Sequence, residues 1–244
     1  MSYKAIYYPE TRFGGFTTVD GTVAFYARIN ALIEADSVVI DFGCGRGQHQ
    51  DDPVPWRRNL RILKNKAKHV IGLDVDPDAT ANPYIDEYRE IAPSGAWPIA
   101  DGFIDMVVCD SVIEHLDDPD AFFGEARRVL RKGTGHLAIR TPNALSYVGI
   151  AQRLIPNRHH SRVLARVQES RKPEDVFRTI YRCNTIPRLR RKLTEHGFDA
   201  VVYGHEAEPA YLEMSRLLYF LGVVHQRLAP RALSPVILAF GRLI

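Results

Sequence analysis

Short apolar runs rich in β-branched residues recur along the chain and alternate with stretches of helical spacing. The clearest runs are residues 37–42 (SVVIDF), 69–75 (HVIGLDV), 103–109 (FIDMVVC) and 136–140 (HLAIR). Continuous apolar runs of this kind suit parallel strands that are covered on both faces, and their alternation with helices is typical of a doubly wound sheet. The pattern therefore predicts an α/β fold with helices on both faces of a mostly parallel sheet.

Two amphipathic stretches carry clear helix boundaries. Residues 117–135 (DDPDAFFGEARRVLRKGTG) begin with acids, space their apolar residues helically and end with basic residues and glycines, as expected of a helix whose charges complement its dipole. Residues 184–198 (NTIPRLRRKLTEHGF) offer Asn184 or Thr185 as the N-cap and Gly197 as the stop. Both stretches are predicted to be helices.

The remaining segments carry weaker signals. A helix is predicted over residues 23–35 with Asp20 as its cap, and the aromatic, glycine-containing stretch before it (YYPETRFGGF) looks like a loop that folds over a site. A further helix is expected over residues 56–67 and a short strand over residues 88–92. Near the C-terminus we expect two strands, residues 199–205 and 235–243, with the amphipathic stretch 211–228 between them. Residues 217–233 are interpreted as a helix that covers the sheet.

Composition narrows the class of protein. A chain of 244 residues with 45% hydrophobic and 25% charged residues fits one globular α/β domain with elaborations. Cys44, Cys109 and Cys183 have no metal-ligand or disulfide-framework spacing, so a reducing, cytoplasmic setting is expected. The N-terminus lacks the apolar region of a signal peptide, and no run reaches the roughly 18 apolar residues of a membrane span.

The charge is unevenly distributed. The chain has a net charge of +3, but residues 151–192 alone hold twelve Arg or Lys and three acids. Arginine predominates in this basic segment and suits bidentate recognition of phosphate, so the segment indicates an anionic partner. A set of solvated helix faces is the plainer interpretation.

A glycine-rich loop follows the first apolar run. In VVIDFGCGRG the glycines at 43, 45 and 47 allow left-handed backbone conformations and close approach of a ligand. The dinucleotide fingerprint G-x-G-x-x-G would need glycine where Gln48 stands. Asp74 ends the next apolar run, and a carboxylate at that strand tip can accept both hydroxyls of a ribose. Loop and acid together predict a ligand that contains a nucleoside; a tight turn without a ligand is the alternative.

Four motifs in order give the chain a family resemblance. IDFGCGRG, GLDVDP, WPIADGFIDMVVCDSVIEHLDDP and RVLRKGTGHLAIRTPN make residues 36–143 resemble the class I S-adenosylmethionine-dependent methyltransferases of the methyltransferase-11 or -12 type. The resemblance implies a Rossmann-like fold, with a seven-stranded, mostly parallel sheet in the order 3-2-1-4-5-7-6. It implies one methyltransferase domain over residues 1–244, divided into an N-terminal lid (1–35), a cofactor-binding core (36–143), a basic substrate-side insertion (144–198) and a C-terminal strand-helix-strand unit (199–244).

The resemblance also implies the cofactor site for S-adenosylmethionine and its product S-adenosylhomocysteine. The methionine part would be lined by Asp41, Gly43, Cys44, Gly45 and Gly47, with its carboxylate near exposed backbone N–H groups. Asp74 would bind the ribose and Val75 would lie beside the adenine, while Asp110 and Ser111 would face the sulfonium. The chain departs from the family in two places. APSGAWPI lacks the usual acid, and DDPVPW inserts a loop before the predicted helix 56–67.

Catalysis needs alignment of the acceptor and, for a hydroxyl acceptor, a base. The resemblance points to His115, at the start of the helix after the fourth strand, with Glu114 as its neighbour and Asp110 nearby; a histidine that only orders the loop is the alternative. The same three residues have side chains that could bind a divalent metal ion, but a metal site is not the favoured interpretation. His159 and His160 are a second pair of candidate bases or anion contacts.

The substrate side is expected after the fifth strand. The candidates are Arg140, Asn143, Tyr181, Arg182, His159 and His160. The leading hypothesis is O-methylation of a small molecule or glycan, anionic or lipid-linked. One alternative is a quinone or lipid precursor, with residues 217–233 contacting the inner face of the membrane. Others are an RNA methyltransferase, disfavoured because CDSV replaces an N-P-P-Y-like tetrapeptide, and a cofactor-binding protein without transfer activity. No DNA partner is indicated.

Overall fold

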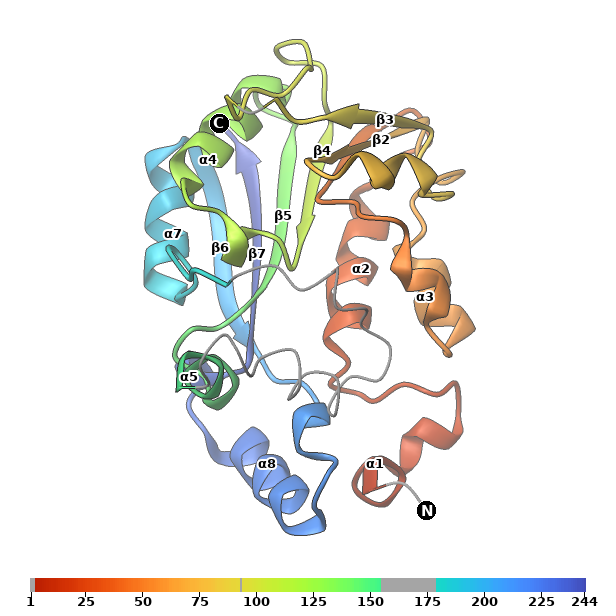
Figure 1. Ribbon diagram of the computed structural model, residues 1–244, viewed down its shortest axis with the longest axis vertical. Coiled ribbons are helices and arrows are strands. Elements are labelled where there is room, and N and C mark those ends of the chain that lie inside the picture. Colours follow the sequence, from red (N-terminus) through yellow and green to blue (C-terminus); the bar gives the residue numbers. More distant parts are fainter. Residues whose placement is uncertain (1–2, 93, 155–178) are drawn as a thin grey trace.

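The computed structural model of the chain describes residues 3–92, 94–154 and 179–244 and contains one seven-stranded sheet (Figure 1). The strand order is β3-β2-β1-β4-β5-β7-β6, which confirms the predicted order. The strands are β1 (Val38–Phe42), β2 (His69–Asp74), β3 (Glu87–Glu90), β4 (Met106–Asp110), β5 (His136–Pro142), β6 (Phe198–His205) and β7 (Val236–Leu243). All neighbours are parallel except β7, which runs antiparallel between β5 and β6.

The register of the parallel strands brings three acids to one edge of the sheet. Asp41, Asp74 and Asp110 lie at or next to the last residues of β1, β2 and β4. β1 pairs with β2 on one side and with β4 on the other, so the chain reverses its direction of winding at β1. Ligands of open α/β sheets bind at the carboxyl ends of the strands beside such a switch point.

Helices cover both faces of the sheet, as the alternating pattern predicted. On one face α4 (Pro119–Val129) and α7 (Ile186–Glu195) bury Phe122, Phe123 and Leu189 against the strands. On the other face α2 (Gly21–Leu32) buries Phe25 and Ile29, and α3 (Pro55–Arg61) lies beside it. The sheet therefore has an apolar core on each side, and its carboxyl edge is left to polar residues.

Several predicted boundaries are confirmed and others are corrected. Asp20 caps α2 by accepting hydrogen bonds from the N–H groups of Thr22 and Val23. The helix predicted over 56–67 ends at Arg61, because the chain then turns and buries Leu63 in the core. His115 lies in the 3-10 turn η4 (Ile113–His115) instead of at the start of a helix; α4 begins at Pro119.

Among the helices that the structure describes, three lie beyond the carboxyl edge of the sheet instead of on its faces. They are α1 (Tyr3–Tyr7), α5 (Tyr147–Leu154) and α8 (Arg216–Leu228), which gather at the lower end of Figure 1. The interpretation of residues 217–233 as a helix that covers the sheet is therefore wrong. Both faces are already covered by α2, α3, α4 and α7, and Tyr219 of α8 instead packs against Tyr3 and Tyr7 of α1.

Candidate functional site

The glycine-rich loop leaves β1 in a conformation that requires glycine. Gly43, Gly45 and Gly47 have φ angles of 70°, 50° and 76°, in the left-handed region. The N–H of Gly43 donates to the carbonyl of Leu73 at 2.7 Å, which ties the loop to the end of β2. A Cβ atom at Gly43 would overlap the side chain of Val112. The loop is therefore held close to the chain that follows β4.

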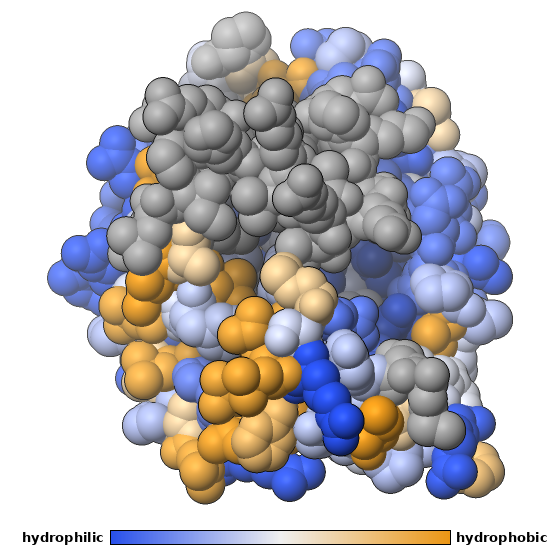
Figure 2. All heavy atoms as spheres, turned by 60° about the horizontal axis from the view of Figure 1, so that its bottom comes forward, coloured by the Kyte–Doolittle hydropathy of each residue, from blue (hydrophilic) through white to orange (hydrophobic). Residues whose placement is uncertain are grey.

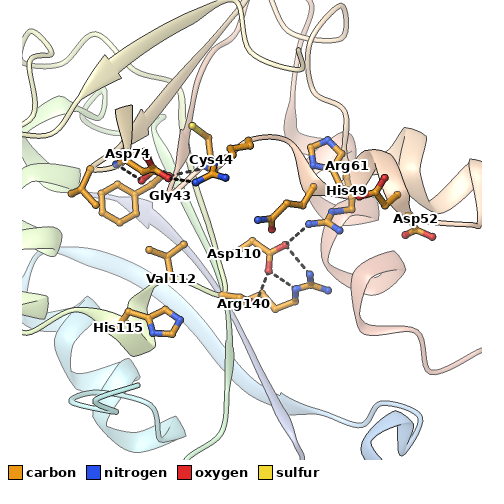
Figure 3. Close-up of a pocket in the computed structure, with 18 of the residues that line it drawn as sticks. Gly43, Cys44, His49, Asp52, Arg61, Asp74, Asp110, Val112, His115 and Arg140 are labelled. Atoms are coloured by element: carbon orange, nitrogen blue, oxygen red, sulfur yellow. Dashed lines mark hydrogen bonds and ion pairs between the residues drawn. The ribbon is translucent and has the colours of Figure 1, made fainter. Parts of the chain in front are cut away.

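A cavity of about 730 Å³ opens at this edge of the sheet (Figure 3), within the range of small-molecule sites. It lies among β1, β2, β4 and the loops that follow them, with further residues from α3 and β5. The predicted site residues on its wall are Gly43, Cys44, Gly45, Asp74, Val75, Asp110, Ser111, His115 and Arg140. The structure thus brings together residues that are up to 97 positions apart in the sequence.

Asp74 is fixed in place by backbone groups on both sides. One carboxylate oxygen accepts a hydrogen bond from the N–H of Gly45 at 2.8 Å, and the other accepts from the N–H of Asp76 at 3.0 Å. Val75 and Ile91 line the cavity next to it, and Val75 is 62% exposed. The carboxylate is oriented before a ligand arrives, which lowers the entropic cost of binding.

Asp110 lies at the centre of a buried charged network. Arg140 donates two hydrogen bonds to its carboxylate, at 2.6 and 2.7 Å, and Tyr26 of α2 donates another at 3.0 Å. Arg140 also donates to the hydroxyl of Thr22 at 2.6 Å. Burial alone would raise the pKa of Asp110, but Arg140, Arg61 and these hydrogen bonds hold it below its ordinary value. Asp110 is therefore ionised and fully engaged, which suits an anchor better than a base.

Two polar side chains on the α3 side of the cavity have unpartnered atoms. Arg61 Nε and His49 Nε2 are buried without a hydrogen-bond partner among the described residues. The Arg61 guanidinium lies 5.8 Å from the centre of the Tyr26 ring, and its Nη2 is 3.9 Å from Asp110. Burial, and then the charge of Arg61, lowers the pKa of His49 to about 4, so this ring is neutral at neutral pH. The result is a cationic wall with unused donor capacity.

The inserted loop is attached to the rest of the site by one arginine. Arg57 of α3 donates to Asp52 at 2.7 Å and to Asp20 at 2.6 Å, and Asp20 is also the cap of α2. This clamp holds α3 against the N-terminus of α2. The sequence alone assigns no function to Arg61, His49 or Tyr26. Only the fold brings Arg61 and His49 to the cavity wall and the hydroxyl of Tyr26 to Asp110.

His115 lies on the cavity wall while its neighbour Glu114 is buried. The His115 side chain is 25% exposed, whereas Glu114 is 4% exposed and accepts a hydrogen bond from the hydroxyl of Thr141 at 2.9 Å. Ser111, just before them, has a φ of 62°. A serine in the left-handed backbone conformation carries a conformational strain on the order of 1 kcal/mol, and such residues cluster at functional sites. The turn therefore presents His115 to the cavity and keeps Glu114 behind it.

Other predicted residues lie away from the cavity wall. Asp41 is next to it, and burial, with a contribution from Asp110, raises the pKa of Asp41 to about 7. Asn143 is fully buried and donates to the carbonyls of Ala232 and Ser234. The predicted residues absent from the described cavity lining are Asp41, Gly47, Glu114, Asn143, Tyr181 and Arg182. His159 and His160 lie outside the described residues. The roles of all these residues stay predictions.

The described residues contain no group of three or more His, Cys, Asp or Glu side chains placed to hold a metal ion. In particular, Asp110 is engaged by Arg140, and Glu114 is directed to Thr141.

Comparison with known proteins identifies the family to which the chain belongs. The sequence model of a methyltransferase-domain family matches residues 20–202, well over half of the chain. A probable S-adenosylmethionine-dependent methyltransferase of Mycolicibacterium smegmatis is 34% identical over 115 residues, which cover 45% of this chain and 39% of the relative. A ubiquinone biosynthesis O-methyltransferase of Cupriavidus pinatubonensis is 30% identical over 112 residues, which cover 45% and 43%. The chain thus matches about two fifths of the length of these curated relatives.

Solved structures share the fold at low sequence identity. An S-adenosylmethionine-dependent methyltransferase from Thermotoga maritima has a TM-score of 0.55 and 15% identity, covering 90% of this chain and 87% of its own. At this identity the likeness concerns the fold alone. It agrees with the strand order described above.

Proposed function

The chain belongs to the class I S-adenosylmethionine-dependent methyltransferases, and from this premise we propose that it methylates an oxygen of a small molecule or glycan. The observation that carries the proposal is the position of His115, an imidazole on the wall of the same cavity as Asp74 and the glycine loop. The cofactor supplies a methyl group activated by a positive sulfur. The protein must align the acceptor and remove its proton, and His115 is a side chain of suitable chemistry for that task.

The cavity supports one orientation of the cofactor. Asp74 would accept hydrogen bonds from the two ribose hydroxyls, and Val75 and Ile91 would contact the adenine. The methionine part would run along the glycine loop past Asp41. In this orientation the amino-acid end points toward the α3 side, where Arg61 Nε has no partner among the described residues. We assign the cofactor carboxylate to Arg61.

The Arg61 assignment predicts a selective loss of affinity. We expect Arg61→Gln to weaken binding of S-adenosylhomocysteine about tenfold or more, since a hydrogen bond to a charged group contributes about 1.5–3 kcal/mol. Binding of methylthioadenosine, which lacks the amino-acid part, should stay unchanged. Isothermal titration with both ligands measures the difference. Arg58→Gln, on the same helix but absent from the cavity lining, is the matched control. An equal loss for both ligands would contradict the assignment.

The test of the proposed function is transfer of labelled methyl. The protein is incubated with isotope-labelled S-adenosylmethionine and a cell extract, and the labelled products are identified. A methyl ether among them supports the proposal. Products labelled only at nitrogen or carbon would overturn O-methylation while leaving the family unaffected. Cofactor binding without any labelled product would favour the binding-protein alternative.

His115 has its own prediction in the same assay. We expect His115→Gln to slow transfer to a hydroxyl about a hundredfold, because general bases contribute at least that much. S-Adenosylhomocysteine affinity should change little, since no cofactor contact is assigned to His115. His69→Gln, at the start of β2, is the matched control. If the His115→Gln protein transfers methyl at the original rate, His115 only orders its loop.

The acceptor is proposed to be anionic. The support is the sequence charge of residues 151–192, with twelve basic residues against three acids. A cytoplasmic location is proposed as well.

A second candidate acceptor is a quinone or lipid precursor at a membrane surface. It is favoured by the exposed apolar side chains of α8 and by the partial similarity to a ubiquinone O-methyltransferase.

A further inference from the structure

Helix α8 is anchored to the molecule by one of its faces. Tyr219 and Val223 are buried, at 0% and 2% exposure, in a cluster with Tyr3, Tyr7 and Tyr8. The hydroxyl of Tyr8 donates to the side-chain carbonyl of Gln226 at 2.7 Å, and Ser215 caps the helix. The inner face therefore fixes both the position and the rotation of α8.

The opposite face of α8 is apolar and exposed. Leu217, Phe220, Leu221 and Leu228 are 66%, 45%, 51% and 79% exposed. Their spacing of three, four and eleven places them on one side of the helix. We call these four residues the α8 apolar face; Figure 2 shows apolar side chains gathered on this side of the molecule. A monomeric protein in water seldom leaves so many large apolar side chains together, so this face indicates a partner.

Basic residues outnumber acids along α8 and just beyond it. Residues 213–244 contain four arginines and one acid, Glu213, which lies just before the helix; Glu208 also lies near Tyr219. Three of these arginines, Arg216, Arg227 and Arg231, are exposed at the two ends of α8 and just after it. An apolar stripe with cationic ends is the pattern of a helix that lies in the interface of an anionic bilayer.

We infer that the α8 apolar face docks onto a membrane that contains anionic phospholipid. At 13 residues α8 is about 20 Å long, which suits a helix lying in the plane of the interface. No helix among the described residues has the length and apolar character to cross a bilayer. A second copy of the chain is a poorer occupant, because a dimer through α8 would bring Arg216, Arg227 and Arg231 of each copy together with only Glu213, just before the helix, to pair with them.

Docking through α8 would turn the substrate side toward the lipid. The cavity and α8 both lie at the carboxyl edge of the sheet. The inference thus adds a membrane-binding surface to the second candidate function, methylation of a lipid-soluble precursor. Its relevance to catalysis rests on that proposed function. The docking itself is independent of methyl transfer, so it can be tested, and can fail, separately from the proposed function.

The test is flotation of the full chain with vesicles. Vesicles of phosphatidylglycerol and phosphatidylcholine in equal parts should carry the protein, and vesicles of phosphatidylcholine alone should carry much less. The double variant Leu217→Asp, Leu221→Asp should reduce partitioning about tenfold or more, since it removes two apolar contacts and adds negative charge. Binding should weaken as salt is added, because arginines supply part of the attraction.

The control is Val201→Asp, which changes an equally exposed apolar residue of β6 outside α8. It should partition like the original chain. Thermal unfolding and S-adenosylhomocysteine binding verify that each variant is folded. Equal partitioning of the double variant, or no binding to anionic vesicles, would overturn the inference. Light scattering that shows a dimer lost only in the double variant would assign the face to a second copy instead.

Discussion

Replacing Asp74 by alanine should weaken binding of S-adenosylhomocysteine about a hundredfold or more. The carboxylate is positioned at the tip of β2 and would accept hydrogen bonds from both ribose hydroxyls. Each hydrogen bond to a charged acceptor contributes about 1.5–3 kcal/mol, and each 1.4 kcal/mol is about tenfold in affinity. Because the Asp74 carboxylate also accepts from the N–H of Gly45, the alanine variant loosens the loop as well. Isothermal titration gives the affinity.

A second variant separates the two effects. Asp74→Asn keeps an oxygen that can hold Gly45 but loses the charge and one acceptor, so its affinity should lie between those of Asp74→Ala and the original chain. Asp78→Ala is the matched control. Its side chain is 69% exposed near the same turn, and we expect a change within about twofold, because exposed ion pairs contribute little. Unchanged affinity in Asp74→Ala would refute the ribose assignment.

The cofactor half of the cavity could be predicted because its signals are local. Gly43, Gly45 and Gly47 need left-handed backbone angles within a five-residue loop, and this need is visible in the sequence itself. Asp74 ends an apolar run, and parallel strands bring such ends to one edge of the sheet. The strand order likewise followed from the family motifs. These parts of the fold depend on short-range chemistry or on a shared topology.

The other half of the cavity could not be predicted because it depends on long-range packing. Tyr26 and Arg61 reach Asp110 from helices whose place on the sheet no local pattern reveals. Residues 51–56 depart from the family motifs just before α3 and at its start, so the family pattern gives no guide there. The prediction for α8 was wrong for a related reason. An amphipathic helix needs an apolar partner, and the sequence does not say whether that partner is the sheet or α1.

Arg140 shows how register decides the meaning of a residue. The sequence offered it as a substrate contact at the end of the fifth strand. In the structure Arg140 is the register partner of Asp110 on the neighbouring strand, and three hydrogen bonds hold its guanidinium. The planar donors of the guanidinium match the geometry of a carboxylate. The sequence does not reveal that the carboxylate of Asp110 lies opposite Arg140. Its geometry suits a clamp that fixes Asp110 and Thr22 beneath the cavity.

Replacing Arg140 by leucine should therefore lower the free energy of unfolding by about 3–5 kcal/mol, the usual cost of leaving one buried charge without its partner. Chemical denaturation measures this change. Arg131→Leu is the matched control, because Arg131 also pairs with an acid, Asp105 at 2.7 Å, but is 46% exposed. Its loss should cost less than about 1 kcal/mol. A small effect at Arg140 would mean that Asp110 does not need the clamp.

The pH dependence of the free energy of unfolding should show whether the loss in Arg140→Leu comes from the unpaired, buried charge of Asp110. In the original chain the pKa of Asp110 is lowered, so its contribution to stability is full above the unfolded pKa of about 3.9 and is lost as the pH falls below it. Without Arg140, burial should raise that pKa, and the sign reverses: protonation then relieves the folded state. The deficit of Arg140→Leu should shrink as the pH falls from about 7 to about 4. Adding Asp110→Asn should recover part of the loss at neutral pH, because it removes the stranded charge; a deficit that is independent of pH and of this second change would point to lost packing instead.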